Sequence, residues 1–310
     1  MSLAMRDAFG KHLVEMGKKH PELIVLDADV SSSTKSALFG KEFPSRFYNV
    51  GVAEGNLAGM AAGLATCGYH PVINAFAIFL SLKSLDQIRN DMCYNKLPVI
   101  IAGAYGGLSD SFDGASHQAI EDIAIFRALP NMEVIVPSDS HQAELALEYA
   151  LSVDHPVYIR LNRNAMPDID TKESDFMAKK AIKITEGKDV TIAANGITAS
   201  MAVEAQAILA KEGISAEVFS VPFVKPLDTT SIFESAKKTG ALVTVEEHLL
   251  AGGFASAIAE EAFPAQLKCK VANIAINDKF GETGPYVPLL AKYGLSADNI
   301  VKTVKELLAK

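Results

Sequence analysis

Short runs rich in valine and isoleucine alternate with helical patterns along the chain, and this alternation limits the fold more than any other feature. A helical pattern over residues 4–19 comes first and is followed by the run "ELIVLDADV" at Glu22–Val30. The other runs of the first half are "FYNVG", "PVINAFAIF", "LPVIIAGAY", "MEVIVPS" and "PVYIRLN", with helices expected near 54–67, 82–94, 117–129 and 141–152. Strands that alternate with helices of this length form mostly parallel sheets covered by helices. We therefore expect an α/β fold.

A polar stretch from Arg163 to Lys188 interrupts the pattern and indicates a boundary between two domains. We expect one domain over 1–165, a linker over 166–188 and a second domain over 189–310, since 310 residues suffice for two cores. The second domain offers the strand patterns "DVTIAAN", "AEVFSVPF", "ALVTVEE" and "VANIAIN" and ends in the helical "SADNIVKTVKELLAK". Each domain should be a mostly parallel sheet flanked by helices.

Charge and hydropathy exclude several classes of partner. A net charge of −8 and a pI near 5.4 argue against a surface that binds nucleic acid or an anionic membrane. The uncharged interval Gly55–Leu82 is long enough to span a membrane, but "CGYHP" at Cys67–Pro71 interrupts it with residues that stop a helix. The N-terminal segment is amphipathic rather than apolar like a signal peptide.

Motif searches remove further alternatives. The three cysteines lack paired spacing, as in reduced cytosolic proteins, so we expect a cytoplasmic location. No G-x-G-x-x-G follows a strand, and no G-x-S-x-G occurs. The seven histidines show no metal-ligand spacing, so we expect no metal ligand in this chain.

Glu54 is the one acid at the start of the apolar segment "NVGVAEGNLAGMAAGLATCG", and the next charged residue is Lys83. An acid in the first turn of a helix is favoured by the helix dipole, and many such residues do nothing more. A buried carboxylate can instead share a proton with a nitrogen base. Phe76 and Phe79, expected at the end of the next strand, suit either a core or a platform for a flat ring. Ligands of open α/β sheets bind at the carboxyl ends of the strands, where these residues are expected.

Together with "FDGASHQ" in the following loop, these segments resemble the C-terminal half of transketolase over essentially the whole chain. "VGVAEGNLAGMAAGLA" is similar to the family's cofactor-activating segment, and "FDGASHQAIEDIAIFRALPNMEVIVPSD" to its D-G-x-x-H-Q signature. "VTVEEHLLAGGFASAIAE" and "FGETGPYVPLLAKYGLSADNIVKTVKELL" resemble its last domain. The resemblance implies a pyrimidine-binding domain for thiamine diphosphate followed by a transketolase C-terminal-type domain.

The resemblance implies that Glu54 hydrogen-bonds N1′ of the cofactor's aminopyrimidine and favours its imino tautomer. Two phenylalanines would pack on that ring, and a leucine replaces the third aromatic residue usual in the family. Two residues at the end of the first apolar run would line the cofactor from the partner's side. The implied cofactor-binding residues are Glu54, Phe76, Phe79, Leu82, Asp29 and Val30.

The resemblance also implies a substrate site. His117 would carry protons beside the reacting hydroxyls, and with Glu54 it is the expected catalytic pair. Asp113 would contact the C2 hydroxyl of the sugar. The residues at the substrate's terminal phosphate would be Arg6, Ser33 and Arg163, with Tyr105 where transketolases usually have a histidine.

The G-D-G motif and distant Asn that bind Mg²⁺ and the diphosphate are missing from the sequence. The resemblance therefore implies the C-terminal subunit of a split transketolase, active with an N-terminal subunit in a heterotetramer. It would transfer a two-carbon ketol unit from a ketose phosphate to an aldose phosphate. Two alternatives stay open: the β-like part of another thiamine enzyme (2-oxo-acid dehydrogenase or 1-deoxyxylulose-phosphate synthase), and a non-catalytic α/β binding protein.

Overall fold

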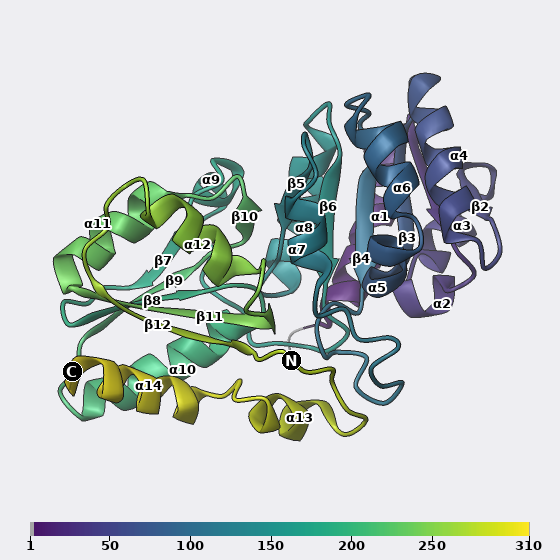
Figure 1. Cartoon of the computed structure of the whole chain (residues 1–310). Helices are drawn as coiled ribbons and strands as arrows, with labels where there is room; N and C mark the ends of the chain where they lie inside the picture. The colour runs from purple at the N-terminus through teal and green to yellow at the C-terminus, as the bar shows by residue number, and fades with distance from the viewer. Residues whose placement is uncertain (1–2, 310) are drawn as a thin grey trace.

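The computed structural model describes residues 3–309 of the chain. Within this range the strands form one sheet of seven and one of five, each covered by helices on both faces (Figure 1). The expected α/β class with two mostly parallel sheets is confirmed. No helix in residues 3–309 combines the length and the apolar character needed to cross a membrane.

The first sheet is parallel except for one edge strand. Its strands, in order across the sheet, are β10 (Phe223–Lys225), β5 (Glu133–Ile135), β6 (Val157–Leu161), β4 (Ile100–Ala104), β3 (His70–Phe76), β1 (Leu23–Asp27) and β2 (Phe47–Asn49). Alternate residues of β1 enter different cores: Leu23 and Val25 lie in one, Ile24 and Leu26 in the other. Burial on both faces explains why these strands appear in the sequence as continuous apolar runs.

The helices of the first domain flank this sheet. In chain order they are α1 (Met5–Lys19), α2 (Ser31–Thr34), α3 (Ala37–Glu42), η1 (Pro44–Arg46), α4 (Glu54–Thr66), α5 (Ala77–Leu82), α6 (Leu85–Gln87), the π-helix η2 (Ile88–Cys93), α7 (Asp122–Arg127) and α8 (Ser140–Leu151). The apolar interval after Glu54 divides as expected at "CGYHP", because α4 ends at Thr66 and β3 begins at His70.

Two helical patterns were wider than the helices that form. The expected helix over 82–94 is split among α5, α6 and η2, and the one over 117–129 shrinks to α7. Phe76 ends β3 as expected, whereas Phe79 lies one turn into α5 rather than in the strand. Apolar spacing alone therefore did not locate the ends of these short helices.

The second domain is built on the five-stranded sheet. Its order is β12 (Lys270–Ile276), β11 (Ala241–Leu249), β8 (Val190–Ala194), β9 (Ala216–Ser220) and β7 (Ile182–Thr185). The helices α10 (Thr198–Lys211) and α14 (Ala297–Ala309) lie on one face, α11 (Thr229–Thr239) and α12 (Phe254–Ala262) on the other, and α13 (Tyr286–Lys292) precedes α14 (Figure 1).

The segment "AEVFSVPF" does not form the single strand that its apolar pattern predicts. β9 stays in the second sheet, whereas β10 pairs antiparallel with β5 of the first sheet. Pro222, which has no N–H to donate, separates them, and its carbonyl accepts a hydrogen bond from Val136 N at 2.7 Å. The second half of the chain therefore contributes a strand to the first sheet. The stretch 166–188, expected as a linker, contains α9 (Glu173–Met177) and the antiparallel edge strand β7.

Candidate active site

The sequence-predicted site residues gather at the carboxyl ends of neighbouring strands in the first sheet. β6, β4, β3 and β1 are adjacent and parallel, and their following segments carry Arg163, Tyr105, Phe79 and Ser33. Because parallel strands end at the same edge of a sheet, segments distant in the sequence meet there. α1, which carries Arg6, reaches the same edge through a bridge between Ala4 and Ala165.

Glu54 begins α4, and only 6% of the residue is exposed. Lys83 Nζ donates a hydrogen bond to its Oε1 at 2.8 Å and lies 3.8 Å from the centre of the Phe79 ring. Lys83 is the first charged residue after Glu54 in the sequence. No hydrogen bond to the second carboxylate oxygen is found among the described residues. Glu54 is therefore a buried acid that pairs with a cation through one oxygen, while the other oxygen has no hydrogen-bond partner within residues 3–309.

Four aromatic side chains form a continuous group beside this pair. Phe76 lies 5.7 Å from Phe79 between ring centroids and stacks on Tyr105 at 4.6 Å with 19° between the planes. The half-buried His117 meets Phe76 and Phe79 edge-on, at 5.9 and 5.3 Å. Ser116 Oγ lies 3.0 Å from His117 Nδ1. These contacts bring the predicted proton carrier next to the predicted ring platform.

The residues expected at the substrate's terminal phosphate also lie close to one another. Arg6 Nη1 donates to the Ser33 carbonyl at 3.2 Å and to the hydroxyl of Tyr105. The guanidinium carbons of Arg6 and Arg163 lie 5.3 and 5.0 Å from the centre of the Tyr105 ring. The Tyr105 backbone has a φ of 65°, in the left-handed region that non-glycine residues rarely adopt. Two cations therefore flank a buried phenol.

Arg163 has an acidic partner that the sequence analysis missed. Its Nη1 donates to Asp110 Oδ1 at 2.7 Å, and Asp110 is fully buried. Burial raises the pKa of Asp110 to about 6; hydrogen bonding and charge repulsion from Asp113 add to the rise, and Arg163 opposes it. Asp113 itself is exposed on the same loop. The segment "GLSDSFDG" spaces the two acids three residues apart, which was the available signal.

Another buried acid, Asp27, shapes the loop that carries Asp29, Val30 and Ser33. Asp27 Oδ1 accepts from Val30 N at 2.6 Å, and Oδ2 accepts from the hydroxyls of Thr34 and Ser36, each at 2.8 Å. Asp29 is exposed, with a φ of 66°, and accepts from Asn49 Nδ2 at 2.8 Å.

Leu82, which ends α5, has 54% of its surface exposed. Among the sequence-predicted site residues, Leu82 therefore lies in the same short helix as Phe79 but is largely exposed.

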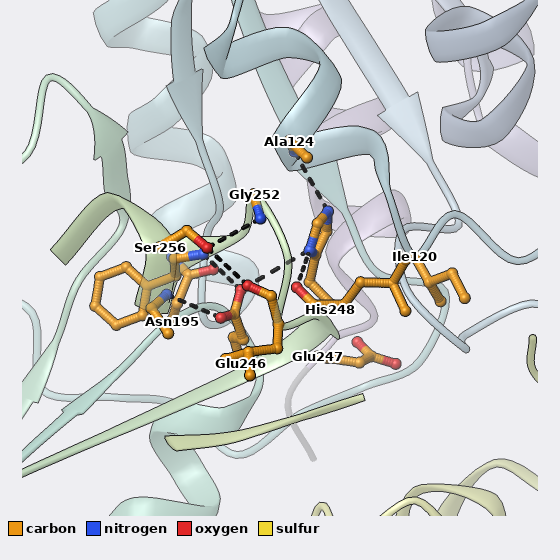
Figure 2. A network of polar contacts seen from close by, with 12 residues as sticks. Ile120, Ala124, Asn195, Glu246, Glu247, His248, Gly252 and Ser256 are labelled. Atoms are coloured by element: carbon orange, nitrogen blue, oxygen red, sulfur yellow. Dashed lines mark hydrogen bonds and ion pairs between the residues drawn. The ribbon is translucent and has the colours of Figure 1, made fainter. Parts of the chain in front are cut away.

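The segment "VEEH" at the end of β11 lies where the two domains meet, and its three polar residues have different partners. Glu246 accepts from the amides of Phe254 and Ala255 at 2.6 and 2.8 Å, at the start of α12 (Figure 2). His248 Nε2 accepts from Ala124 N of the first domain at 3.3 Å, and Nδ1 lies 2.7 Å from the Leu249 carbonyl (Figure 2). Burial lowers the pKa of His248 to about 4, which agrees with an uncharged ring that accepts at Nε2.

Glu247 lies between these two residues and faces the loops of the first domain. Its Oε1 accepts from Leu108 N at 2.8 Å and from the hydroxyl of Tyr286 at 2.9 Å. Arg160 Nη2 donates to the Glu247 carbonyl at 3.0 Å, while Arg160 Nε pairs with Asp122 at 2.8 Å. Burial raises the pKa of Glu247 to about 7.

Two family profiles together match nearly all of the chain. The profile described as "Transketolase, pyrimidine binding domain" matches residues 1–168, and "Transketolase, C-terminal domain" matches residues 179–300.

Known proteins and a solved structure also resemble this chain over nearly its whole length. The "Putative transketolase C-terminal section" of Methanocaldococcus jannaschii is 42% identical and covers 99% of this chain and 96% of that protein. A 1-deoxy-D-xylulose-5-phosphate synthase of Desulforudis audaxviator is 36% identical over 98% of this chain but only 48% of its own length. A solved structure titled "Split gene transketolase, inactive beta4 tetramer" is 45% identical, with a TM-score of 0.91 over 99% of both chains.

Proposed function

Because the chain belongs to the transketolase family, we propose that it is the C-terminal subunit of a split transketolase, which transfers a two-carbon ketol unit from a ketose to an aldose. The observation that carries this proposal is the length of the match. The relative named a C-terminal section is matched over 96% of its length, whereas the synthase is matched over about half. We therefore infer that a separate subunit supplies the half of the site that the synthase carries within one chain.

The residues at the sheet edge fit the pyrimidine end of thiamine diphosphate. A nitrogen, Lys83 Nζ, already donates to the buried Glu54 while lying on the face of Phe79. An aminopyrimidine ring needs the same combination of a carboxylate at one edge and an aromatic face. When bound, the cofactor supplies a nucleophilic carbon and stabilises the negative charge that develops as the ketose is cleaved.

Several side chains at the sheet edge would hold the cofactor's pyrimidine ring. Glu54 holds the ring through a hydrogen bond and shares a proton with it, and a dry carboxylate suits this exchange. Phe76 and Phe79 position the ring by packing, and Asp29 and Val30 border the cofactor from the loop after β1. Leu82, exposed at the end of α5, would take the position of the family's third aromatic residue.

The substrate occupies the adjoining region in this proposal. His117, in edge contact with both phenylalanines, moves protons to and from the sugar hydroxyls, and Asp113 accepts a hydrogen bond from the C2 hydroxyl. Arg6 and Arg163, with Ser33 and Tyr105 between them, bind the anionic tail, because guanidinium groups match the geometry of phosphate oxygens.

The partner subunit completes the site. We propose that an N-terminal subunit binds Mg²⁺ and the diphosphate, and that two copies of each chain form a heterotetramer with sites at subunit interfaces. The similar solved structure is titled an inactive β4 tetramer, which supports a chain that needs a second kind of subunit.

Calorimetric titration with thiamine diphosphate and Mg²⁺ tests whether the cofactor site is divided between two subunits in this way. We expect weak binding by this chain alone, since it contacts only the pyrimidine end, and tight binding by its mixture with the N-terminal subunit. Glu54→Gln in the mixture should weaken binding, while the exposed Glu261→Gln serves as a control. Tight binding by the isolated chain would refute the split site.

A further inference from the structure

Three successive backbone amides after Tyr105 each donate a hydrogen bond. Gly106 N donates to the Leu161 carbonyl at 3.0 Å, and Gly107 N donates to the Ala119 carbonyl at 2.8 Å. Both partners belong to the first domain. The next amide, Leu108 N, donates to Glu247 Oε1 of the second domain at 2.8 Å. The turn that places the Tyr105 ring is therefore fixed partly from outside its own domain.

Glu247 approaches this turn very closely at Gly107. The φ of Gly107 is 66°, and a Cβ at this position would lie 2.3 Å from the carboxyl carbon of Glu247. Such a separation is impossible for a real side chain, so the carboxylate can reach Leu108 N only because residue 107 is a glycine. The contact thus depends on a glycine of the first domain and on a carboxylate of the second.

The same carboxylate leads to the loop of Arg163 through a second branch. The hydroxyl of Tyr286 donates to Glu247 Oε1 at 2.9 Å and accepts from Asn162 Nδ2 at 2.7 Å. Asn162 Oδ1 accepts from Asn164 N at 2.8 Å, so the turn on either side of Arg163 is fixed by one side chain. Asn162 Nδ2 also lies 3.5 Å from Glu247 Oε2, so one carboxylate of the second domain supports both loops that flank the proposed tail site.

We propose that Glu247 is a positioning residue that sets the affinity for the substrate's anionic tail by holding the loops of Tyr105 and Arg163 from the second domain. The effect on the tail rests on the proposed function, whereas the holding of the loops does not.

A buried carboxylate is a costly way to pack two domains together, since apolar side chains would do this without desolvating a charge. The neighbouring Glu246 is also buried, but its carboxylate accepts from the first amides of α12 and lies 3.9 Å from His248 Nδ1, all within its own domain. It has no hydrogen bond to the Tyr105 or Arg163 loop among the described residues. Glu247 bonds to these loops and Glu246 does not, so Glu246 serves as a control for a neighbouring buried acid.

The first measurement is hydrogen–deuterium exchange of the full chain, followed by mass spectrometry. Glu247→Ala should speed exchange in peptides covering 105–109 and 162–164 at least about tenfold, because Leu108 N and Tyr286 lose their acceptor. Glu247→Gln keeps an acceptor oxygen and should restore most of the protection. Tyr286→Phe should affect 162–164 and leave 105–109 unchanged. Glu246→Gln should change neither segment.

The second measurement is steady-state kinetics of the assembled enzyme. Glu247→Ala should raise KM for a phosphorylated ketose about tenfold and leave kcat and the KM of the unphosphorylated ketose nearly unchanged. Glu246→Gln should leave all of these values unchanged. Equal effects on both ketoses, or unchanged exchange in 105–109, would overturn the proposal. If the wild-type assembly shows no turnover, the proposed function fails, and the exchange data still decide whether Glu247 holds the loops.

Discussion

Replacing Glu247 by glutamine should change how the stability of the chain depends on pH. Burial raises the pKa of this carboxyl from 4.5 to about 7, so the folded state holds the proton more tightly than the unfolded state. The stability that Glu247 contributes is therefore complete below about pH 4.5 and is lost as the pH rises through 7. Glutamine does not titrate, so the variant should lack this loss.

The size of the effect follows from the shift. A rise from 4.5 to about 7 corresponds to roughly 3 kcal/mol at about 1.4 kcal/mol per pH unit, and most of it falls between about pH 5 and 8. Because Glu247 is fully buried, solvent screening does not reduce this figure appreciably. Relative to the wild type, Glu247→Gln should therefore gain roughly 3 kcal/mol across this interval.

Urea unfolding followed by circular dichroism, for both proteins at pH 5 and pH 8, measures this difference in the free energy of unfolding. The exposed Glu261→Gln is the control and should show no pH-dependent difference from the wild type. A constant difference between Glu247→Gln and the wild type at the two pH values would refute the reasoning, because it would mean that the buried carboxyl does not titrate in this range.

Three further predictions follow from single contacts. Gly107→Ala should lower the free energy of unfolding by about 1–3 kcal/mol in thermal melts, because its φ of 66° and its contact with Glu247 leave no room for a methyl group. Arg163→Ala should raise KM for a phosphorylated ketose roughly ten- to a hundredfold, and an equal change for the unphosphorylated ketose would exclude Arg163 as a tail ligand. Arg46→Met should lower the free energy of unfolding by about 2 kcal/mol in urea titrations, since Arg46 donates to the carbonyls of Gly17 and His20 at 2.7 and 2.8 Å; an unchanged midpoint would contradict this.

The main features of the fold were predictable because they depend on local patterns. Continuous apolar runs such as "ELIVLDADV" belong to strands buried on both faces, and β1 shows this directly. The transfer of β10 to the other sheet was not predictable in this way. An apolar strand has the same pattern whichever sheet it joins, and only Pro222 marked the place where the run divides.

The sequence predicted which segments form the candidate site, but it did not predict which side chains pair with one another there. The resemblance located Glu54, His117 and Arg163, whereas Lys83, Asp110 and Glu247 emerged only from the contacts. Ion pairs join residues far apart in the chain, and no periodicity links Arg163 to Asp110. The charge-free interval between Glu54 and Lys83 was the one sequence signal of such a pair, because it makes Lys83 the first charged residue that follows Glu54.

The most direct test of the account is ketol transfer by this chain reconstituted with its N-terminal subunit, thiamine diphosphate and Mg²⁺. The account predicts transfer from a ketose to an aldose by the pair, none by either chain alone, and loss of at least about a hundredfold in Glu54→Gln. The variant should keep the wild-type assembly in sedimentation. Condensation of pyruvate in place of ketol transfer, or full activity of Glu54→Gln, would contradict it.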